Sequence, residues 1–385
     1  MLSSIFMNRI YFDNSSTSFP KPKSVIMAMN SYFYENGSNL QRGESSYNFD
    51  AEDVIFSLRE ELSNLVSSNN SECVIFTPNV TTALNTVISG YLKSGDHVII
   101  SPLEHNAVMR PLVENNISYT LLDSDNFGHV IEENIKKSIK KETKACIIQG
   151  ANNVTGCVQN INKIGNTLKE YGIPLILDSA QSLGHIDYNL EKDNISILCF
   201  TGHKSLFGPQ GTGGFITSSE IIKEIKPLIY GGTGSFSDLL TQPDNLPDKF
   251  ESGTQNIIGL MGLNAAIKYL KGNKEKIRKT ERELRRYFIS LLDNIKCIKI
   301  HSYSDEIPIV SISSNMFDVA KLANYLASKN IQTRVGLHCN VMTHKFIKTY
   351  PYGTVRFSFS HFNTKDELDI CFSYIKEFLN DEGLL

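Results

Sequence analysis

Tryptophan is absent from this sequence of 385 residues, and neither sign of charge is in strong excess. The 38 basic and 41 acidic residues leave a formal net charge of -3. A strong excess of one sign is typical of proteins that bind nucleic acids or membrane surfaces. The composition therefore favours neither a nucleic-acid nor a membrane partner. The length and an apolar fraction of 41% predict one large domain and a smaller one.

Long apolar runs and paired cysteines are also missing. No stretch is long enough to cross a bilayer. The first residues, MLSSIFMNRIYFDNSS, lack the basic start, apolar middle and cleavage site of a secretory signal. The seven cysteines include no CxxC pair, which argues against a disulfide framework and a four-cysteine zinc site. We therefore expect reduced thiols, no bound metal and a cytoplasmic location.

Short apolar runs alternate with polar, helix-compatible segments between residues 70 and 220. This alternation is typical of an α/β fold with a mostly parallel sheet that helices cover on both faces. Ligands of such sheets bind at the carboxyl ends of the strands, so the polar residues after each run are the candidates for chemistry. The runs that predict strands are HVIIS at 97–101, ISYTLLD at 117–123, ACIIQGA at 145–151, PLILDSA at 174–180, SILCFTG at 196–202 and GGFITS at 213–218.

The pattern changes after about residue 256 to a long charged helix from Lys274, followed by short strands and two further helices. We therefore predict a large domain at 15–256 and a smaller α+β domain at 257–385, joined by the N-terminal segment 1–14. The two later helices each have one apolar face at helical spacing. These faces consist of Val319, Leu322, Ala323 and Leu326, and of Leu368, Cys371, Phe372, Ile375 and Leu379; Thr364 and Glu367 form a capping box before the second face.

A lysine and an aspartate follow two of the predicted strands. Asp178 comes directly after LIL, and Lys204 follows LCFTGH. The carboxylate and the amine are therefore expected at the same edge of the sheet. A partly desolvated lysine has a lowered pKa and a nucleophilic amine. Pyridoxal 5'-phosphate (PLP) requires such an amine, and an anion beside its pyridinium nitrogen, so the pair predicts a PLP site.

Ten segments in order resemble the class V aminotransferase family of fold-type I PLP enzymes, and within it the cysteine desulfurase and selenocysteine lyase branch. The similarity runs nearly from end to end, and it implies the fold-type I architecture. The segments are YFDNSSTSFPKP at 11–22, FTPNVTTALN at 76–85, SPLEHNAVMRP at 101–111, NNVTG at 152–156, DSAQSLG at 178–184, TGHKSLFGPQGTGG at 201–214, YGGTGS at 230–235, FESGTQN at 250–256, RVGLHCN at 334–340 and VRFSFSHFNT at 355–364.

The resemblance implies roles around the cofactor ring. Lys204 would carry PLP as a Schiff base, and Asp178 would contact the pyridinium nitrogen. His105 would stack on the ring and take part in catalysis. Gln181 and Asn153 would lie near the phenolic oxygen, and Asn153 is expected beside the substrate as well.

The resemblance also implies where the phosphate would lie. It would bind Thr81 at the start of a helix, because free amide groups and the helix dipole attract anions there. Thr201 and His203 would complete this site. Thr233 matches a position that reaches the phosphate from the neighbouring subunit, which implies a homodimer with a shared active site.

Two further residues resemble the family's substrate-handling groups. Arg356 resembles the arginine that binds the carboxylate of the substrate, for which a planar guanidinium is suited. Cys339 resembles the nucleophilic cysteine of group II desulfurases, whose thiolate accepts sulfur as a persulfide. The implied reaction converts L-cysteine to L-alanine with Lys204 as the base at the α carbon, and a partner protein is the possible sulfur acceptor.

Two departures from the family pattern leave the reaction open. Asn340 follows Cys339 where the family usually has alanine, and Ser15 and Ser16 replace an alanine-rich pair. One PLP scaffold supports several reactions, so selenocysteine lyase, C–S lyase and epimerase activities are alternatives. A noncatalytic protein that retains the fold is a further one.

Other site types are disfavoured. The glycines at 208, 211, 213 and 214 lack the Gly-Lys-Ser/Thr ending of a phosphate loop, and no GxGxxG follows the first strand. His338, Cys339 and His344 lack an evident fourth metal ligand. Cys146, Cys199 and Cys371 lie in apolar segments and are expected to be inert core thiols.

Overall fold

A seven-stranded sheet forms the larger part of the molecule, for which the computed structural model describes residues 9–36 and 46–385. Its order is β2-β8-β7-β6-β5-β3-β4, and all neighbours are parallel except β8, which runs antiparallel to β2 and β7. The six predicted strands are present, and the predicted α/β fold is confirmed. The strands are β2 (Val74–Thr77), β3 (His97–Ile100), β4 (Ser118–Leu121), β5 (Thr143–Gln149), β6 (Leu175–Asp178), β7 (Ile195–Thr201) and β8 (Gly213–Thr217).

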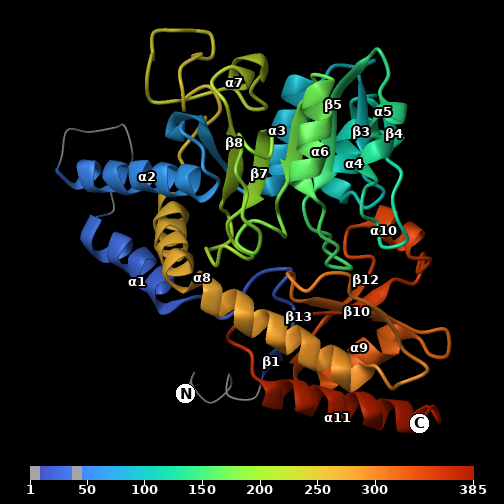
Figure 1. Ribbon diagram of the computed structural model, residues 1–385. Helices are drawn as coiled ribbons and strands as arrows, with labels where there is room; N and C mark the ends of the chain where they lie inside the picture. Colours follow the sequence, from blue (N-terminus) through green and yellow to red (C-terminus); the bar gives the residue numbers. More distant parts are fainter. Residues whose placement is uncertain (1–8, 37–45) are drawn as a thin grey trace.

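Helices cover both faces of this sheet because successive strand residues point to opposite sides. Ile99 in β3 joins a core with residues of α2 (Ser46–Leu65), α6 (Ile161–Glu170) and the first half of α8 (Ile257–Leu292). Its neighbours Val98 and Ile100 join a second core with α3 (Val80–Tyr91) and α4 (Asn106–Glu114). Figure 1 shows these layers in the upper part of the molecule.

A four-stranded antiparallel sheet forms the smaller part, in the order β12-β13-β10-β9. The predicted apolar faces of α9 (Val319–Ser328) and α11 (Lys365–Asp381) pack in its core, although Phe372 is only partly buried. The capping box of Thr364 and Glu367 is formed at the start of α11. The strands are β9 (Lys299–His301), β10 (Ile309–Ser313), β12 (Arg334–Gly336) and β13 (Thr354–Ser358).

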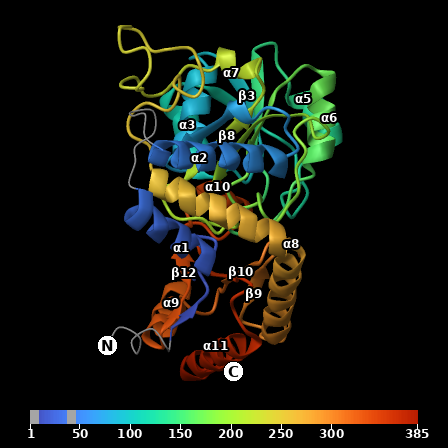
Figure 2. The same ribbon diagram turned by 90° about the vertical axis from the view of Figure 1, so that its left-hand side faces the viewer.

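Helix α8 connects the two sheets, and it begins at Ile257 rather than at Lys274 as the charge pattern predicted. Side chains between Leu260 and Ile277 belong to the core of the large sheet. Leu284, Phe288 and Leu292 belong to the core of the small one. Figure 2 shows α8 passing below α2 and continuing toward the small sheet. The first turns of α8 were missed because their buried apolar residues lack the charges that mark an exposed helix. The domain boundary after residue 256 stays a prediction.

Residues 1–8 of the predicted N-terminal segment lie outside the described residues, and its remaining part, from Arg9, packs against the small sheet before the chain enters the large part. β1 (Ile10–Tyr11) pairs in parallel with β11 (Ile331–Gln332), and Phe12 lies in the core of the small sheet. Helix α1 (Lys23–Ser31) then packs against α8. Among the described residues no helix is long and apolar enough to span a membrane. Shorter elements are the π-helix Tyr32–Asn36, the 3-10 helices Ser71–Cys73 and Glu132–Asn134, α5 (Ile135–Ser138), α7 (Ile221–Glu224) and α10 (Val341–Phe346).

Candidate active site

The loops after the parallel strands of the large sheet meet the small sheet at one place (Figure 1). Asn153, which follows β5, accepts a hydrogen bond at its main-chain carbonyl from Nη1 of Arg356 in β13, at 2.9 Å. Two other predicted site residues lie in the same layer: Asp178 is the last residue of β6, and Lys204 follows β7. The structure therefore brings residues that are far apart in the chain to the carboxyl edge of the large sheet.

The charges of Lys204 and Asp178 each shift the pKa of the other group. Desolvation lowers the pKa of Lys204 to about 8, although the negative charge of Asp178 opposes this shift. Burial raises the pKa of the Asp178 carboxyl, which Lys204 and a hydrogen bond from the Ala180 amide at 3.0 Å oppose. Near neutral pH a much larger fraction of this amine is therefore neutral and nucleophilic than of an ordinary lysine.

His105 presents a neutral imidazole beside this pair. It is the N-cap of α4, and its Nδ1 accepts a hydrogen bond from the Ala107 amide at 3.0 Å, so the ring proton lies on Nε2. Burial lowers the pKa of His105 to about 3, with smaller contributions from the positive charges of Lys204 and Arg110. An uncharged flat ring of this kind is suited to stack on a conjugated ring. The stacking role stays a prediction.

The predicted phosphate residues come from different elements of the chain. Thr81 is exposed in the first turn of α3, which Asn79 caps by accepting from the Thr82 amide at 2.9 Å. Nδ1 of His203 is buried and has no hydrogen-bond partner in the described part of the chain. Burial lowers the pKa of His203 to about 3. A buried nitrogen without a partner and a helix start with free amides fit a bound anionic group.

Two threonines of the predicted phosphate site donate hydrogen bonds to main-chain carbonyls of the protein itself. The hydroxyl of Thr201 is buried and donates to the Thr212 carbonyl at 3.4 Å. Thr233 lies on the loop between α7 and α8, where its hydroxyl donates to the Ser235 carbonyl at 3.0 Å. This loop extends away from the large sheet (Figure 1). A contact of Thr233 with a phosphate in a second subunit stays a prediction.

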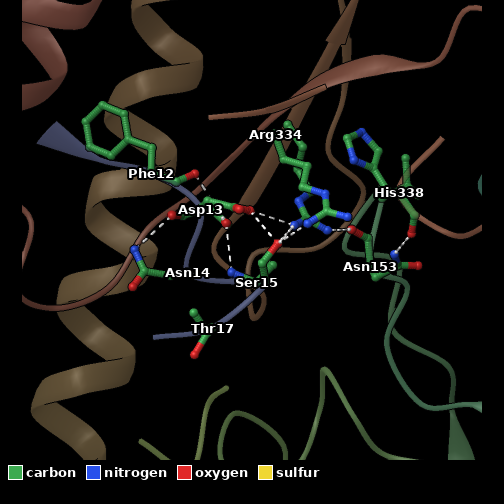
Figure 3. Close-up of polar contacts among 12 residues, drawn as sticks. Phe12, Asp13, Asn14, Ser15, Thr17, Asn153, Arg334 and His338 are labelled. Atoms are coloured by element: carbon green, nitrogen blue, oxygen red, sulfur yellow. Dashed lines mark hydrogen bonds and ion pairs between the residues drawn. The ribbon is translucent and has the colours of Figure 1, made fainter. Parts of the chain in front are cut away.

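Arg356 is buried, with 3% of its surface exposed, and the N-terminal segment holds it. Its Nη2 donates to Oδ1 of Asp13 at 2.8 Å and to the hydroxyl of Ser16 at 2.9 Å. Its Nε has no hydrogen-bond partner among the described residues. Figure 3 shows the Asp13 segment on one side of the arginine side chains and Asn153 on the other. This Nε is therefore a donor without a partner in the described part of the chain, and binding of a substrate carboxylate by Arg356 stays a prediction.

The sequence analysis missed Asp13 as a partner of Arg356. The only signal was its place in the segment YFDNSS, since a pair separated by 343 residues leaves no local pattern. The two serines that depart from the family pattern make specific contacts. Ser16 donates to Oδ1 of Asp13 at 2.7 Å, and the Ser15 carbonyl accepts from Nε2 of Gln181 at 2.9 Å.

Cys339 is the only exposed cysteine of the seven. Its loop meets the start of α4, where the Asn106 amide donates to the Cys339 carbonyl at 3.0 Å, next to His105. His338 and Cys339 both have left-handed backbones, with φ of 48° and 56°. This conformation costs about 1–2 kcal/mol per residue without glycine, so neighbouring contacts have to hold the loop.

Those contacts come from the loops of the large sheet. The Cys339 carbonyl accepts a hydrogen bond from the Asn106 amide at 3.0 Å. Nδ2 of Asn153 donates to the His338 carbonyl at 2.8 Å, as Figure 3 shows. The thiol is therefore exposed on a segment whose backbone is fixed to the start of α4 and to the loop after β5.

The described residues contain no cluster of three or more histidine, cysteine, aspartate or glutamate side chains that fits a metal ion. His338 instead shares a hydrogen bond between its Nε2 and the Thr354 hydroxyl, at 2.9 Å. His344 shares one between its Nδ1 and the Thr349 hydroxyl, at 2.7 Å.

A lysine and a buried aspartate at neighbouring strand ends of a helix-covered sheet define the class of fold-type I PLP-dependent enzymes. The description "Aminotransferase class-V" belongs to the family model that matches residues 10–371, and the chain belongs to this family.

Curated relatives support this assignment over almost the whole chain. The chain is 30% identical to a probable cysteine desulfurase of Methanothermobacter thermautotrophicus, with 97% of this chain and 95% of the relative covered. It is also 30% identical to a probable cysteine desulfurase of Pyrococcus abyssi, with 96% and 94% covered.

Solved structures are similar over the same length. The apo structure of a cysteine desulfurase from Thermococcus onnurineus NA1 has a TM-score of 0.88 at 27% identity, covering 97% of this chain and 95% of that chain. A cysteine desulfurase from Escherichia coli has a TM-score of 0.85 at 22% identity, with 97% and 95% covered, and shows the shared fold alone.

Proposed function

We propose that this protein is a PLP-dependent cysteine desulfurase that converts L-cysteine to L-alanine and retains the sulfur on Cys339 as a persulfide. The observation that carries the proposal is the position of Cys339: the one exposed thiol lies on a loop whose backbone is hydrogen-bonded to Asn106, next to His105, and to Asn153. The names of the curated relatives support the same reaction.

The residues around Lys204 fit PLP. The lysine amine would hold the aldehyde, the Asp178 carboxylate would face the ring nitrogen and the neutral imidazole of His105 would lie on the ring. The first turn of α3 and the unpartnered Nδ1 of His203 would take the phosphate. When bound, PLP supplies an electron sink that makes the α proton of an amino acid acidic.

Two side chains of the protein would then bind the substrate and transfer its proton. Arg356 would bind the substrate carboxylate, because its Nε is unpaired and its buried guanidinium is fixed in place by Asp13. Lys204, with a pKa of about 8, would accept the α proton and return a proton later.

Cys339 would accept the sulfur atom. Its thiolate attacks the substrate sulfur, an S–S bond forms and the bond between the β carbon and sulfur breaks, with its electron pair left on the carbon side. A proton delivered to the β carbon completes the methyl group. Overall, L-cysteine and the Cys339 thiol give L-alanine and a Cys339 persulfide, so no external oxidant or reductant is needed.

The proposal extends to the assembly and the location. The loop between α7 and α8 exposes apolar side chains, as a surface that pairs with a second copy would. A cytoplasmic location suits seven free cysteines, and a partner protein would remove the persulfide. The exposed residues of this loop include Leu228, Ile229, Tyr230, Phe236, Leu239 and Leu240.

The test is an assay of the purified protein with PLP and L-cysteine, in which alanine, sulfide and pyruvate are measured together. We expect absorption of bound PLP, and equal amounts of alanine and sulfide in the presence of a thiol reductant. Cys339→Ser should lose both products and keep the absorption. Cys297→Ser, which changes a buried cysteine in the core of the smaller part of the molecule, is the matched control and should keep both.

Other outcomes would identify the alternatives. Pyruvate with sulfide would indicate a C–S lyase, and turnover of selenocysteine but not cysteine would indicate a selenocysteine lyase. Racemised cysteine without sulfide would indicate an epimerase. Bound PLP without any turnover would indicate a noncatalytic protein that retains the fold.

A further inference from the structure

We propose that Asn340 is a positioning residue that holds the Cys339 thiol at the site by tying its loop to Asn153. The inference rests on the proposed function and adds to it a contact that the family pattern does not provide, since alanine is usual at this place. An alanine side chain has no polar atom with which to form such a tie.

The side-chain amide of Asn340 uses both of its hydrogens and its oxygen. It is fully buried. Its Nδ2 donates to the Leu103 carbonyl at 2.9 Å and to Oδ1 of Asn153 at 2.8 Å. Its Oδ1 accepts from the Thr343 amide at 3.0 Å and thereby caps α10. A buried amide with these partners fixes the backbone of the residue next to Cys339.

Asn153 connects this tie to the substrate side of the site. Its Nδ2 donates to the His338 carbonyl, and its main-chain carbonyl accepts from Arg356. Figure 3 shows Asn153 between His338 and the arginine side chains. One residue therefore joins the loop of the thiol to the guanidinium that would hold the substrate carboxylate.

The loop needs such a tie because its backbone is strained. His338 and Cys339 are consecutive residues with positive φ, and neither is a glycine. The Asn106 amide holds the Cys339 carbonyl, and the next residue, Asn340, is held through its own side chain by Asn153. Without Asn340 the loop gains access to relaxed conformations, and the thiol is less often in reach of the substrate sulfur.

Two Asn340 variants and one control separate the tie, which is the pair of hydrogen bonds from Nδ2 of Asn340 to Leu103 and Asn153, from the cap of α10. Asn340→Ala removes both. Asn340→Asp keeps the oxygen that caps Thr343 but replaces the two N–H donors with a second, buried carboxyl oxygen against the Leu103 carbonyl and Oδ1 of Asn153, so the tie is broken while the cap oxygen stays. Asn160→Ala is the matched control, because Asn160 caps α6 from an exposed position by accepting from the Lys163 amide at 3.2 Å.

Hydrogen exchange of the PLP-loaded protein, followed by mass spectrometry, measures the tie directly. We expect faster exchange in the peptide around Asn106 in both Asn340 variants, because the Cys339 carbonyl of a loosened loop holds that amide for a smaller fraction of the time. Exchange around Thr343 should rise in Asn340→Ala more than in Asn340→Asp. Asn160→Ala should leave both peptides unchanged. This readout does not depend on turnover, so a failure of the proposed function leaves it intact.

Kinetics then test the role in positioning. We expect kcat for alanine formation to fall by about 10–100-fold in both Asn340 variants, which is the scale of a small misplacement of a reacting group. KM for L-cysteine and the absorption of bound PLP should stay as in the unmodified protein. Wild-type exchange around Asn106 with wild-type kcat in Asn340→Asp would overturn the inference.

Discussion

Nη2 of Arg356 lies 2.8 Å from Oδ1 of Asp13, and the side chains are 3% and 8% exposed. The guanidinium that would bind the substrate carboxylate is thus already paired before any ligand arrives. A buried pair that loses one partner leaves an uncompensated charge, which is far more costly than a missing surface pair. Asp13 therefore affects both the stability of the chain and the position of Arg356.

Asp13→Asn should lower the free energy of unfolding by about 3–5 kcal/mol, because the buried guanidinium loses its counter-charge. Urea denaturation followed by circular dichroism measures this change. The control is Glu377→Gln, which breaks a solvent-accessible pair with Lys329 and should leave the free energy of unfolding nearly unchanged. Equal stability of the two variants would mean that Asp13 does not offset the charge of Arg356.

Lys204 should react with PLP in a pH-dependent manner. Only the neutral amine attacks an aldehyde, so the rate for cofactor-free protein should rise with pH around a midpoint of about 8. Asp178→Asn removes the charge that raises the pKa of Lys204, so its midpoint should move to lower pH. Stopped-flow absorbance measures both.

The control for this shift is Asp244→Asn, which changes an exposed carboxylate on the loop between α7 and α8. It should leave the midpoint unchanged. A midpoint near the ordinary lysine pKa of about 10.4 would contradict the desolvation of Lys204.

Iodoacetamide should label one cysteine of the seven in the folded protein. Cys339 is exposed, whereas burial raises the pKa of Cys73 to about 11 and that of Cys157 to about 12. Mass spectrometry of peptides should find carbamidomethyl on Cys339 after brief treatment, and on all seven after unfolding. Early labelling of Cys73 or Cys157 would show that these cores open readily.

Leu240→Asp should weaken a homodimer. Leu240 is fully exposed on the loop between α7 and α8, and a charge there opposes burial in an apolar interface. Light scattering of the unmodified protein should give about twice the chain mass of 43.2 kDa. The variant should shift toward that of one chain. Leu385→Asp, an exposed residue at the C-terminus, is the control. A monomeric unmodified protein would refute the prediction.

Much of the fold was predictable from local patterns. Apolar runs such as SILCFTG predicted strands, because a strand that is covered on both faces excludes charges. The helical spacing of Leu322 and Leu326 predicted α9 for a similar reason. The start of α8 was missed, since a helix buried against a sheet loses the polar face that marks a helix in the sequence.

The sequence alone determined the chemical groups and their order: Asp178 ends one strand and Lys204 follows the next, and parallel strands place their carboxyl ends at one edge. Tertiary structure alone decided the pairing of Asp13 with Arg356 and of Asn340 with Asn153. These contacts join segments that are far apart in the chain, and only the packing of the two sheets brings them within hydrogen-bond distance.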